Sequence, residues 1–146
     1  MAKTLDLPQH TDFPVFRAVP TRWMDNDHYG HVNNAAYYSF FDTAVNSYLM
    51  TATGTDTRDL PAIGIVAETG CRYFSEVSFP DALEVGLRLE KLGNSSVVYQ
   101  LGLFRVGDPT LAALGRFVHV YVDSAHRKPV PIPEPIRTAL QPLLVD

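Results

Sequence analysis

The feature that most constrains this chain is a helix-forming segment that is apolar around most of its circumference. From about Asn34 to the Thr53-Gly54-Thr55 run, apolar residues recur at intervals of three and four positions, the period of an α-helix. The stripe consists of Tyr37, Phe41, Ala44, Val45 and Tyr48. Tyr38, Phe40 and Leu49 add apolar surface off this stripe. A helix without a broad polar face is buried on several sides, so the rest of the chain must enclose it.

The segments around this helix have the patterns of β-strands. One precedes the helix, with Pro20 indicating an edge or a bulge. Those that follow are rich in β-branched and aromatic residues or alternate apolar and polar residues with a period of two. Turns at Gly93-Asn94 and Gly107-Asp108-Pro109 join them as hairpins. The predicted strands span residues 15–23, 62–77, 83–90, 97–103 and 117–122, and a short helix spans 134–140.

This order predicts an α+β fold, with an antiparallel sheet wrapped around one long central helix. Residues 1–13 form an N-terminal lead-in in this interpretation, and residues 14–146 form a single domain. The open edge and the other face of such a sheet also need cover, which favours a dimer with a continuous sheet.

Composition narrows the classes of partner and location. The formal net charge of -4 gives no basic footprint for nucleic acid. The charged fraction, 19%, is low enough to indicate that another subunit covers part of the exterior. The single cysteine, Cys71, excludes an intramolecular disulfide. Because no apolar run has the length of a membrane span or a secretory signal, we expect a cytoplasmic protein without a membrane partner.

Residues 25–34 place carboxylates, histidines and amides in a turn directly before the buried helix. A helix N-terminus presents unpaired backbone N–H groups and a positive dipole end. These groups can polarise a carbonyl and hold the oxyanion that forms when it is attacked. A nearby carboxylate can attack directly or deprotonate a water. Aspartate and asparagine are also the commonest turn and cap residues, so the arrangement alone fits a catalytic loop or a structural turn.

Two further groups of titratable residues have simpler interpretations. His28 and His31 are three residues apart with acids nearby, but no third ligand of evident placement accompanies them. We therefore expect no metal site and no cofactor. His119 lies in the last predicted strand, where we interpret it as a packed strand residue.

The run Asp25-x-Asp27-x-x-Gly30-His31-Val32-Asn33-Asn34-x-x-Tyr37 resembles the signature of the 4-hydroxybenzoyl-CoA thioesterase-like family of hotdog-fold acyl-CoA thioesterases. It is also similar to the His-Val-Asn-Asn segment of plant acyl-carrier-protein thioesterases. The resemblance continues through the helix and into residues 79–81 and 92–96. It implies the hotdog fold and hydrolysis of an acyl-CoA to a carboxylic acid and CoA. It also implies a homodimer or homotetramer.

The resemblance also implies roles for individual residues. Asp27 falls on the family's catalytic carboxylate, as nucleophile or general base, and the backbone N–H near Asn34 falls on the group that polarises the thioester carbonyl. His31 matches a functional histidine of the acyl-carrier-protein branch. Further residues are expected to shape the site or bind substrate, with arginines at the CoA phosphates. These residues are Gly30, Asn33, Tyr37, Arg72 and Arg88, and Lys91 and Arg105 are further candidates for the phosphates.

Two alternatives accompany this prediction. A hydratase or dehydratase of acyl thioesters would need an Asn-Pro and a His at a fixed interval after the aspartate, and the residues after Asp27 do not match that run. A non-catalytic hotdog protein that binds acyl-CoA or a small ligand stays open, because a fold alone does not determine function.

Overall fold

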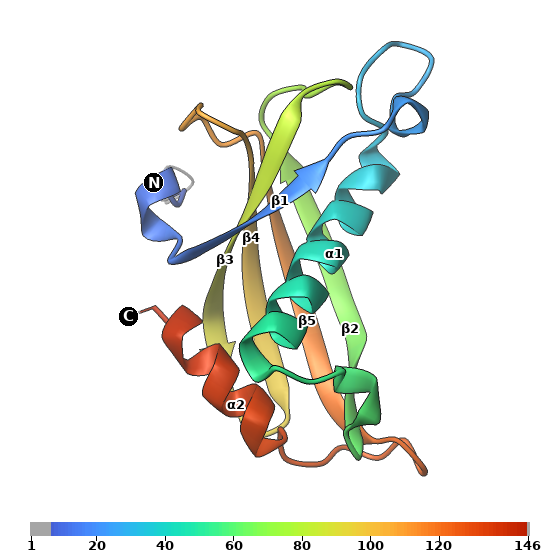
Figure 1. Cartoon of the computed structure of the whole chain (residues 1–146), viewed down its shortest axis with the longest axis vertical. Coiled ribbons are helices and arrows are strands. Elements are labelled where there is room, and N and C mark those ends of the chain that lie inside the picture. Colours follow the sequence, from blue (N-terminus) through green and yellow to red (C-terminus); the bar gives the residue numbers. More distant parts are fainter. Residues whose placement is uncertain (1–6, 146) are drawn as a thin grey trace, which may run out of the picture.

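The computed structural model describes residues 7–145, and its helices and strands follow the predicted order (Figure 1). Five antiparallel strands form one sheet in the order β1-β3-β4-β5-β2, and the long helix α1 lies across one face. The elements are β1 (Val15–Pro20), α1 (Asn34–Thr53), β2 (Ala62–Tyr73), β3 (Ala82–Leu92), β4 (Ser96–Arg105), β5 (Ala113–Asp123) and α2 (Glu134–Leu140). The predicted α+β architecture is therefore confirmed. Within the described residues, neither helix combines the length and apolarity that crossing a membrane requires.

The core lies between α1 and the sheet. Alternate residues of β3 and β4 point towards α1, as the period of two requires. These residues are Leu83, Val85, Leu87, Leu89, Val97, Tyr99, Leu101 and Leu103, and each is at most 1% exposed. On β5, the Phe41 ring of α1 lies so close to Gly115 that a Cβ there would come within 2.6 Å of it. The missing side chain of Gly115 thus fixes how closely the helix approaches the sheet.

The opposite face of the sheet is partly covered by the segment before β1. Gly86 and Gly102 face each other across β3 and β4, and the Phe13 ring packs on both. Phe13 is 4% exposed. The described part of the predicted lead-in, residues 7–13, therefore packs on the sheet. Residues 1–6 of that lead-in lie outside the described residues.

Two strands end earlier than predicted. β1 stops at Pro20, and a single 3-10 turn at Trp23–Asp25 replaces the expected end of the strand. β2 stops at Tyr73 because the N–H groups of Phe74 and Ser75 both turn to the Ala112 carbonyl, at 2.8 and 3.1 Å. The last strand is longer than expected and begins at Ala113.

Strand β2 forms one edge of the sheet. It pairs only with β5 among the described strands, and most of its side chains are exposed, including Ile65 at 40% and Val66 at 51%. A twelve-residue edge of this kind carries a row of backbone groups available to another chain. The dimer expected from the sequence stays a prediction.

Candidate functional site

Asp25 anchors the loop between β1 and α1. Its side chain is almost fully buried and accepts hydrogen bonds from the Arg22 backbone N–H at 2.7 Å and from the Arg22 guanidinium at 2.9 Å. Its carbonyl accepts the Asn33 N–H at 2.7 Å. The first acid of the pair therefore closes the 3-10 turn and ties it to the start of the helix.

Asp27 has a different environment at the solvent-facing tip of the same loop. Its Oδ1 atom accepts the N–H groups of Tyr29 at 2.8 Å and His31 at 3.3 Å. The turn requires a positive φ of 87° at Gly30, which glycine adopts without strain. No group in residues 7–145 donates a hydrogen bond to Oδ2 of Asp27. One carboxylate oxygen is thus held in place, while the other accepts no hydrogen bond from the described residues.

The start of α1 leaves one backbone donor available. Asn33 is the N-cap, and its Oδ1 accepts the Ala35 N–H at 2.9 Å. Its carbonyl accepts the Ala36 N–H, also at 2.9 Å. Among the hydrogen bonds of the described residues, none uses the Asn34 N–H. This N–H therefore lies at the positive end of the helix dipole without a protein partner.

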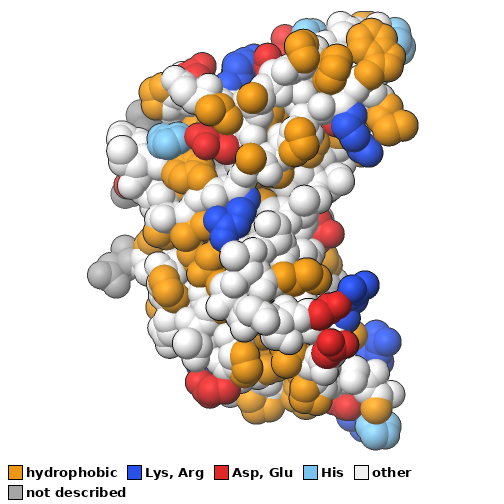
Figure 2. Space-filling model, viewed as in Figure 1, with side chains coloured by type: hydrophobic (Ala, Val, Ile, Leu, Met, Phe, Trp, Pro, Cys, Tyr) orange, Lys and Arg blue, Asp and Glu red, His pale blue; other side chains and the backbone are white. Residues whose placement is uncertain are grey.

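A cavity of about 630 Å³ brings the loop, the helix start and the end of β2 together. Its lining residues are Asp27, Tyr29, His31, Val32, Asn34, Tyr37, Tyr73, Phe74, Ser75 and Glu76. Asp27 and Asn34, the residues with the unpaired carboxylate oxygen and the unpaired N–H, thus line one cavity. Trp23 and Met24, at the outer side of the loop, are 76% and 73% exposed. Figure 2 shows hydrophobic side chains gathered at this end of the molecule.

The residues after β2 form the second wall of the cavity and are tied to the first. The Val32 N–H donates to the Val77 carbonyl at 2.9 Å, and the Tyr73 hydroxyl donates to the Asn34 carbonyl at 3.4 Å. His31 Nε2 lies 3.2 Å from the Glu76 carboxylate, which gives an ion pair when the histidine is protonated. These contacts hold residues 73–77 beside the start of the helix.

Two tyrosines contribute uncharged polar groups to the wall. The rings of Tyr37 and Tyr73 meet edge to face with their centroids 4.9 Å apart. Burial, together with nearby Cys71, raises the pKa of both phenols above their ordinary value. Both remain protonated near neutral pH, so they can donate hydrogen bonds without placing a charge in the cavity.

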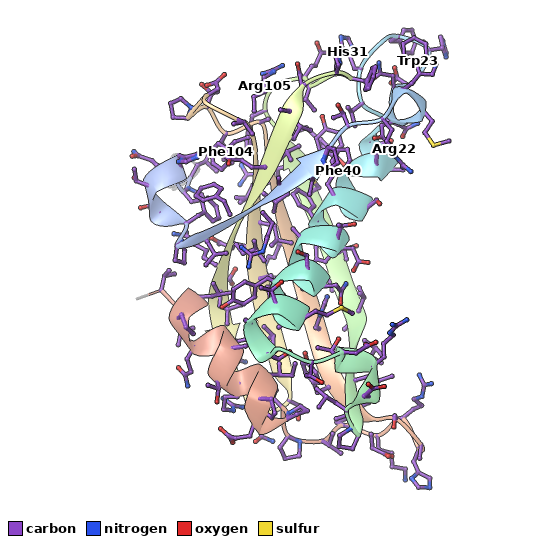
Figure 3. The ribbon with its side chains drawn as sticks, in the orientation of Figure 1. Arg22, Trp23, His31, Phe40, Phe104 and Arg105 are labelled. Carbon is purple, nitrogen blue, oxygen red and sulfur yellow. The ribbon has the colours of Figure 1, made fainter. Side chains whose placement is uncertain are left out.

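Arg105 holds the same wall from β4. Its guanidinium donates to the Asp81 carboxylate at 3.0 Å and to the Glu76 carbonyl. Figure 3 shows Arg105 at the same end of the molecule as His31. Arg105, a candidate for a CoA phosphate, is thus engaged with protein groups that fix residues 76–81.

The cavity gathers four of the residues singled out in the sequence, Asp27, His31, Asn34 and Tyr37. Gly30 and Asn33 shape the loop and the helix start without lining it. Arg72 lies over the Phe74 ring, 5.4 Å from its centroid, and is therefore close to the cavity wall.

Arg88 lies elsewhere in the fold. It is on the face of the sheet opposite α1, where it donates to Gln100 at 2.8 Å and covers the Phe13 ring. The structure does not bring it to this cavity.

Sequence reasoning missed the second wall. Tyr73, Phe74, Ser75 and Glu76 fall within a segment that we predict as a continuous strand, and no motif distinguishes them. Only the end of the strand at Tyr73, which depends on the distant Ala112 carbonyl, turns them towards the helix. Within residues 7–145, no three His, Cys, Asp or Glu side chains form a group that could hold a metal ion.

Comparisons with known proteins agree with this architecture. A family model described as the thioesterase-like superfamily matches residues 19–140. The crystal structure of the PA5185 protein from Pseudomonas aeruginosa has 48% sequence identity and a TM-score of 0.91, covering 95% of this chain and 97% of that one. A thioesterase from Thermus thermophilus, complexed with coenzyme A and zinc, has 30% identity and a TM-score of 0.75, covering 90% of this chain and 95% of that one.

A curated protein is similar to this chain at lower identity. The uncharacterized protein YsmA of Bacillus subtilis is 26% identical over 115 residues, which is 78% of each chain. The structure of a 1,4-dihydroxy-2-naphthoyl-CoA thioesterase from Synechocystis shares the fold at 17% identity and a TM-score of 0.78. Since the family model spans most of the chain and the solved relatives share its architecture, this protein belongs to the thioesterase-like superfamily and has the hotdog fold.

Proposed function

We propose that this protein is an acyl-CoA thioesterase that hydrolyses an acyl-CoA to a free carboxylic acid and CoA. The observation that carries the proposal is that Asp27, whose Oδ2 accepts no hydrogen bond from a described residue, and Asn34, whose N–H donates to none, line the same cavity. Hydrolysis of a thioester needs a group that delivers the nucleophile and a donor that stabilises the oxyanion.

The chemistry follows from these two groups. In one route, Asp27 takes a proton from a water whose oxygen adds to the thioester carbonyl carbon. The Asn34 N–H holds the resulting oxyanion until the C–S bond breaks, and the proton then passes from Asp27 to the CoA thiolate. In the other route, Asp27 itself adds to the carbonyl carbon and expels the thiolate, and water hydrolyses the anhydride. The geometry is compatible with both routes.

His31 and Tyr37 have supporting roles in this proposal. The His31 N–H helps to hold the Asp27 carboxylate, and its ring contacts Glu76 across the cavity. Tyr37 forms part of the wall that shields the reacting carbonyl from bulk water. The coenzyme A bound to the Thermus thermophilus relative supports a CoA ester as substrate. Arg72, beside the cavity, is the cation that we assign to a CoA phosphate.

The proposed functional unit is a homodimer joined through β2, with a tetramer as the larger form. The exposed edge of β2 ends at Tyr73, which lines the cavity together with the residues that follow it. Pairing of two such edges continues the sheet and removes its unpaired backbone groups. Ile65→Glu, on this edge, should shift the protein towards monomers in light scattering coupled to gel filtration. Val106→Glu, at a position exposed outside the strands, should leave the mass unchanged.

The proposal is tested by free-thiol release from a panel of short, long and aromatic acyl-CoA esters. We expect wild-type protein to hydrolyse at least one class. A non-catalytic binder would instead bind CoA esters in isothermal titration without releasing thiol from any of them. That result would overturn the enzymatic proposal and leave Asp27 as a turn residue.

A further inference from the structure

The start of α1 offers a developing oxyanion only one backbone donor. Asn33 occupies the Ala35 N–H with its side chain and the Ala36 N–H with its carbonyl, so the Asn34 N–H alone remains free in residues 34–36. Oxyanion sites for acyl transfer usually combine backbone N–H groups with further donors aimed at the same oxygen. A second donor has to come from another part of the cavity.

Ser75 is the residue of the cavity wall with an unused donor. Its Oγ atom is covered by protein but makes no hydrogen bond with any described residue. Native proteins pair nearly all buried polar atoms, and Ser75 is the one cavity-lining residue among the described residues whose buried side-chain oxygen lacks a partner, which makes its hydroxyl a candidate donor to a ligand. The backbone of Ser75 is fixed, because its N–H donates to the Ala112 carbonyl at 3.1 Å.

The position of Ser75 along the chain brings it to the start of the helix. Segment 73–77 is tied to segment 32–34 on both sides of this residue. Tyr73 donates to the Asn34 carbonyl on one side, and the Val77 carbonyl accepts the Val32 N–H on the other. Ser75 lies midway between the two ties. Ser75 lines the cavity, and since no described residue holds its buried hydroxyl, rotation about χ1 leaves that hydroxyl free to change direction.

We propose that the Ser75 hydroxyl is the second oxyanion donor of the site, acting on the same thioester oxygen as the Asn34 N–H. This inference rests on the proposed thioesterase function. The hydroxyl donates a hydrogen bond when the carbonyl oxygen becomes negative, and no bond to Ser75 forms or breaks. The unpaired hydroxyl of the free protein is thus a donor kept ready for the transition state.

The decisive comparison is between Ser75→Thr and Ser75→Val. Threonine and valine side chains have the same shape, but threonine carries a hydroxyl where valine carries a second methyl group. The threonine variant should keep kcat within a few-fold of wild type. The valine variant should lose about 100-fold in kcat, the effect of removing one oxyanion donor, with a much smaller change in KM. Ser75→Ala should lose a similar factor while its melting temperature stays at or above that of wild type, because an unpaired buried hydroxyl is removed.

Tyr99→Phe is the matched control, because it also removes a buried and unpaired hydroxyl but lies outside the cavity lining. It should raise the melting temperature and leave kcat unchanged. Equal kcat in folded Ser75→Thr, Ser75→Val and Ser75→Ala would overturn the assignment of Ser75 while leaving the thioesterase function intact. Absence of thiol release by wild-type protein would instead contradict the proposed function itself.

Discussion

The close approach of helix to sheet at Gly115 gives a stability prediction whose size follows from the structure. In Gly115→Ala, the new Cβ would lie 2.6 Å from the Phe41 ring, where ordinary contact begins at 3.4 Å. Phe41 is fully buried and cannot swing into solvent. The helix therefore has to move outward, and overpacking of this kind costs about 1–3 kcal/mol. For a chain of this size, the melting temperature should fall by about 3 to 10 °C.

Gly70→Ala is the matched control for this substitution. Gly70 lies in β2, and a Cβ there would have nothing within 4 Å. Thermal unfolding followed by circular dichroism should show Gly70→Ala close to wild type and Gly115→Ala clearly below both. A Gly115→Ala variant as stable as the Gly70→Ala variant would refute the argument that this glycine sets the depth of α1.

Two further substitutions separate structural from functional polar groups. Asp25→Asn should lower the free energy of unfolding in urea by about 1–3 kcal/mol, because it weakens the partly buried hydrogen bonds from Arg22 to a buried carboxylate. The folded fraction of Asp25→Asn should still release thiol faster than Asp27→Asn. An equal loss of thiol release in the two variants would contradict a structural role for Asp25 and a catalytic role for Asp27. Burial lowers the pKa of His119 below 6.5, although Asp42 opposes the shift. As the pH falls below about 6.5, His119 therefore takes up a proton in the unfolded chain before it does so in the folded chain. The free energy of unfolding decreases as a result. Urea unfolding at about pH 7.5 and 5.5 should show a smaller loss in His119→Phe, and an equal loss would exclude His119 as the cause.

The fold could be predicted from the sequence because its main signals are local. The apolar helix and the alternating strands each have a period that a short window contains, and wrapping the sheet around the helix buries their apolar faces together. The loop could be placed for the same reason, since Asp27 and Asn34 are close in sequence. His119, interpreted as a packed strand residue, is buried at 5% exposure.

The second wall of the cavity could not be predicted, because it depends on contacts between distant residues. Ser75 and Glu76 reach the helix start through the Ala112 carbonyl and the Val77–Val32 hydrogen bond. The position of Arg88 on the opposite face depends on the register of β3, since a shift of one residue reverses every side chain. The alternation of apolar and polar residues divides the side chains of a strand between two faces. The elements that pack on those faces decide which face lies near a ligand.

The most direct test of the account compares kcat for thiol release by wild type and Asp27→Asn, on the ester that wild type hydrolyses best. The substitution keeps the shape of the side chain and removes its charge, and the amide oxygen can still accept the Tyr29 and His31 N–H groups. The account predicts loss of about 10³-fold or more in kcat, with an unchanged melting temperature and retained CoA binding. Turnover by folded Asp27→Asn within a few-fold of wild type would contradict the central claim that Asp27 carries the chemistry.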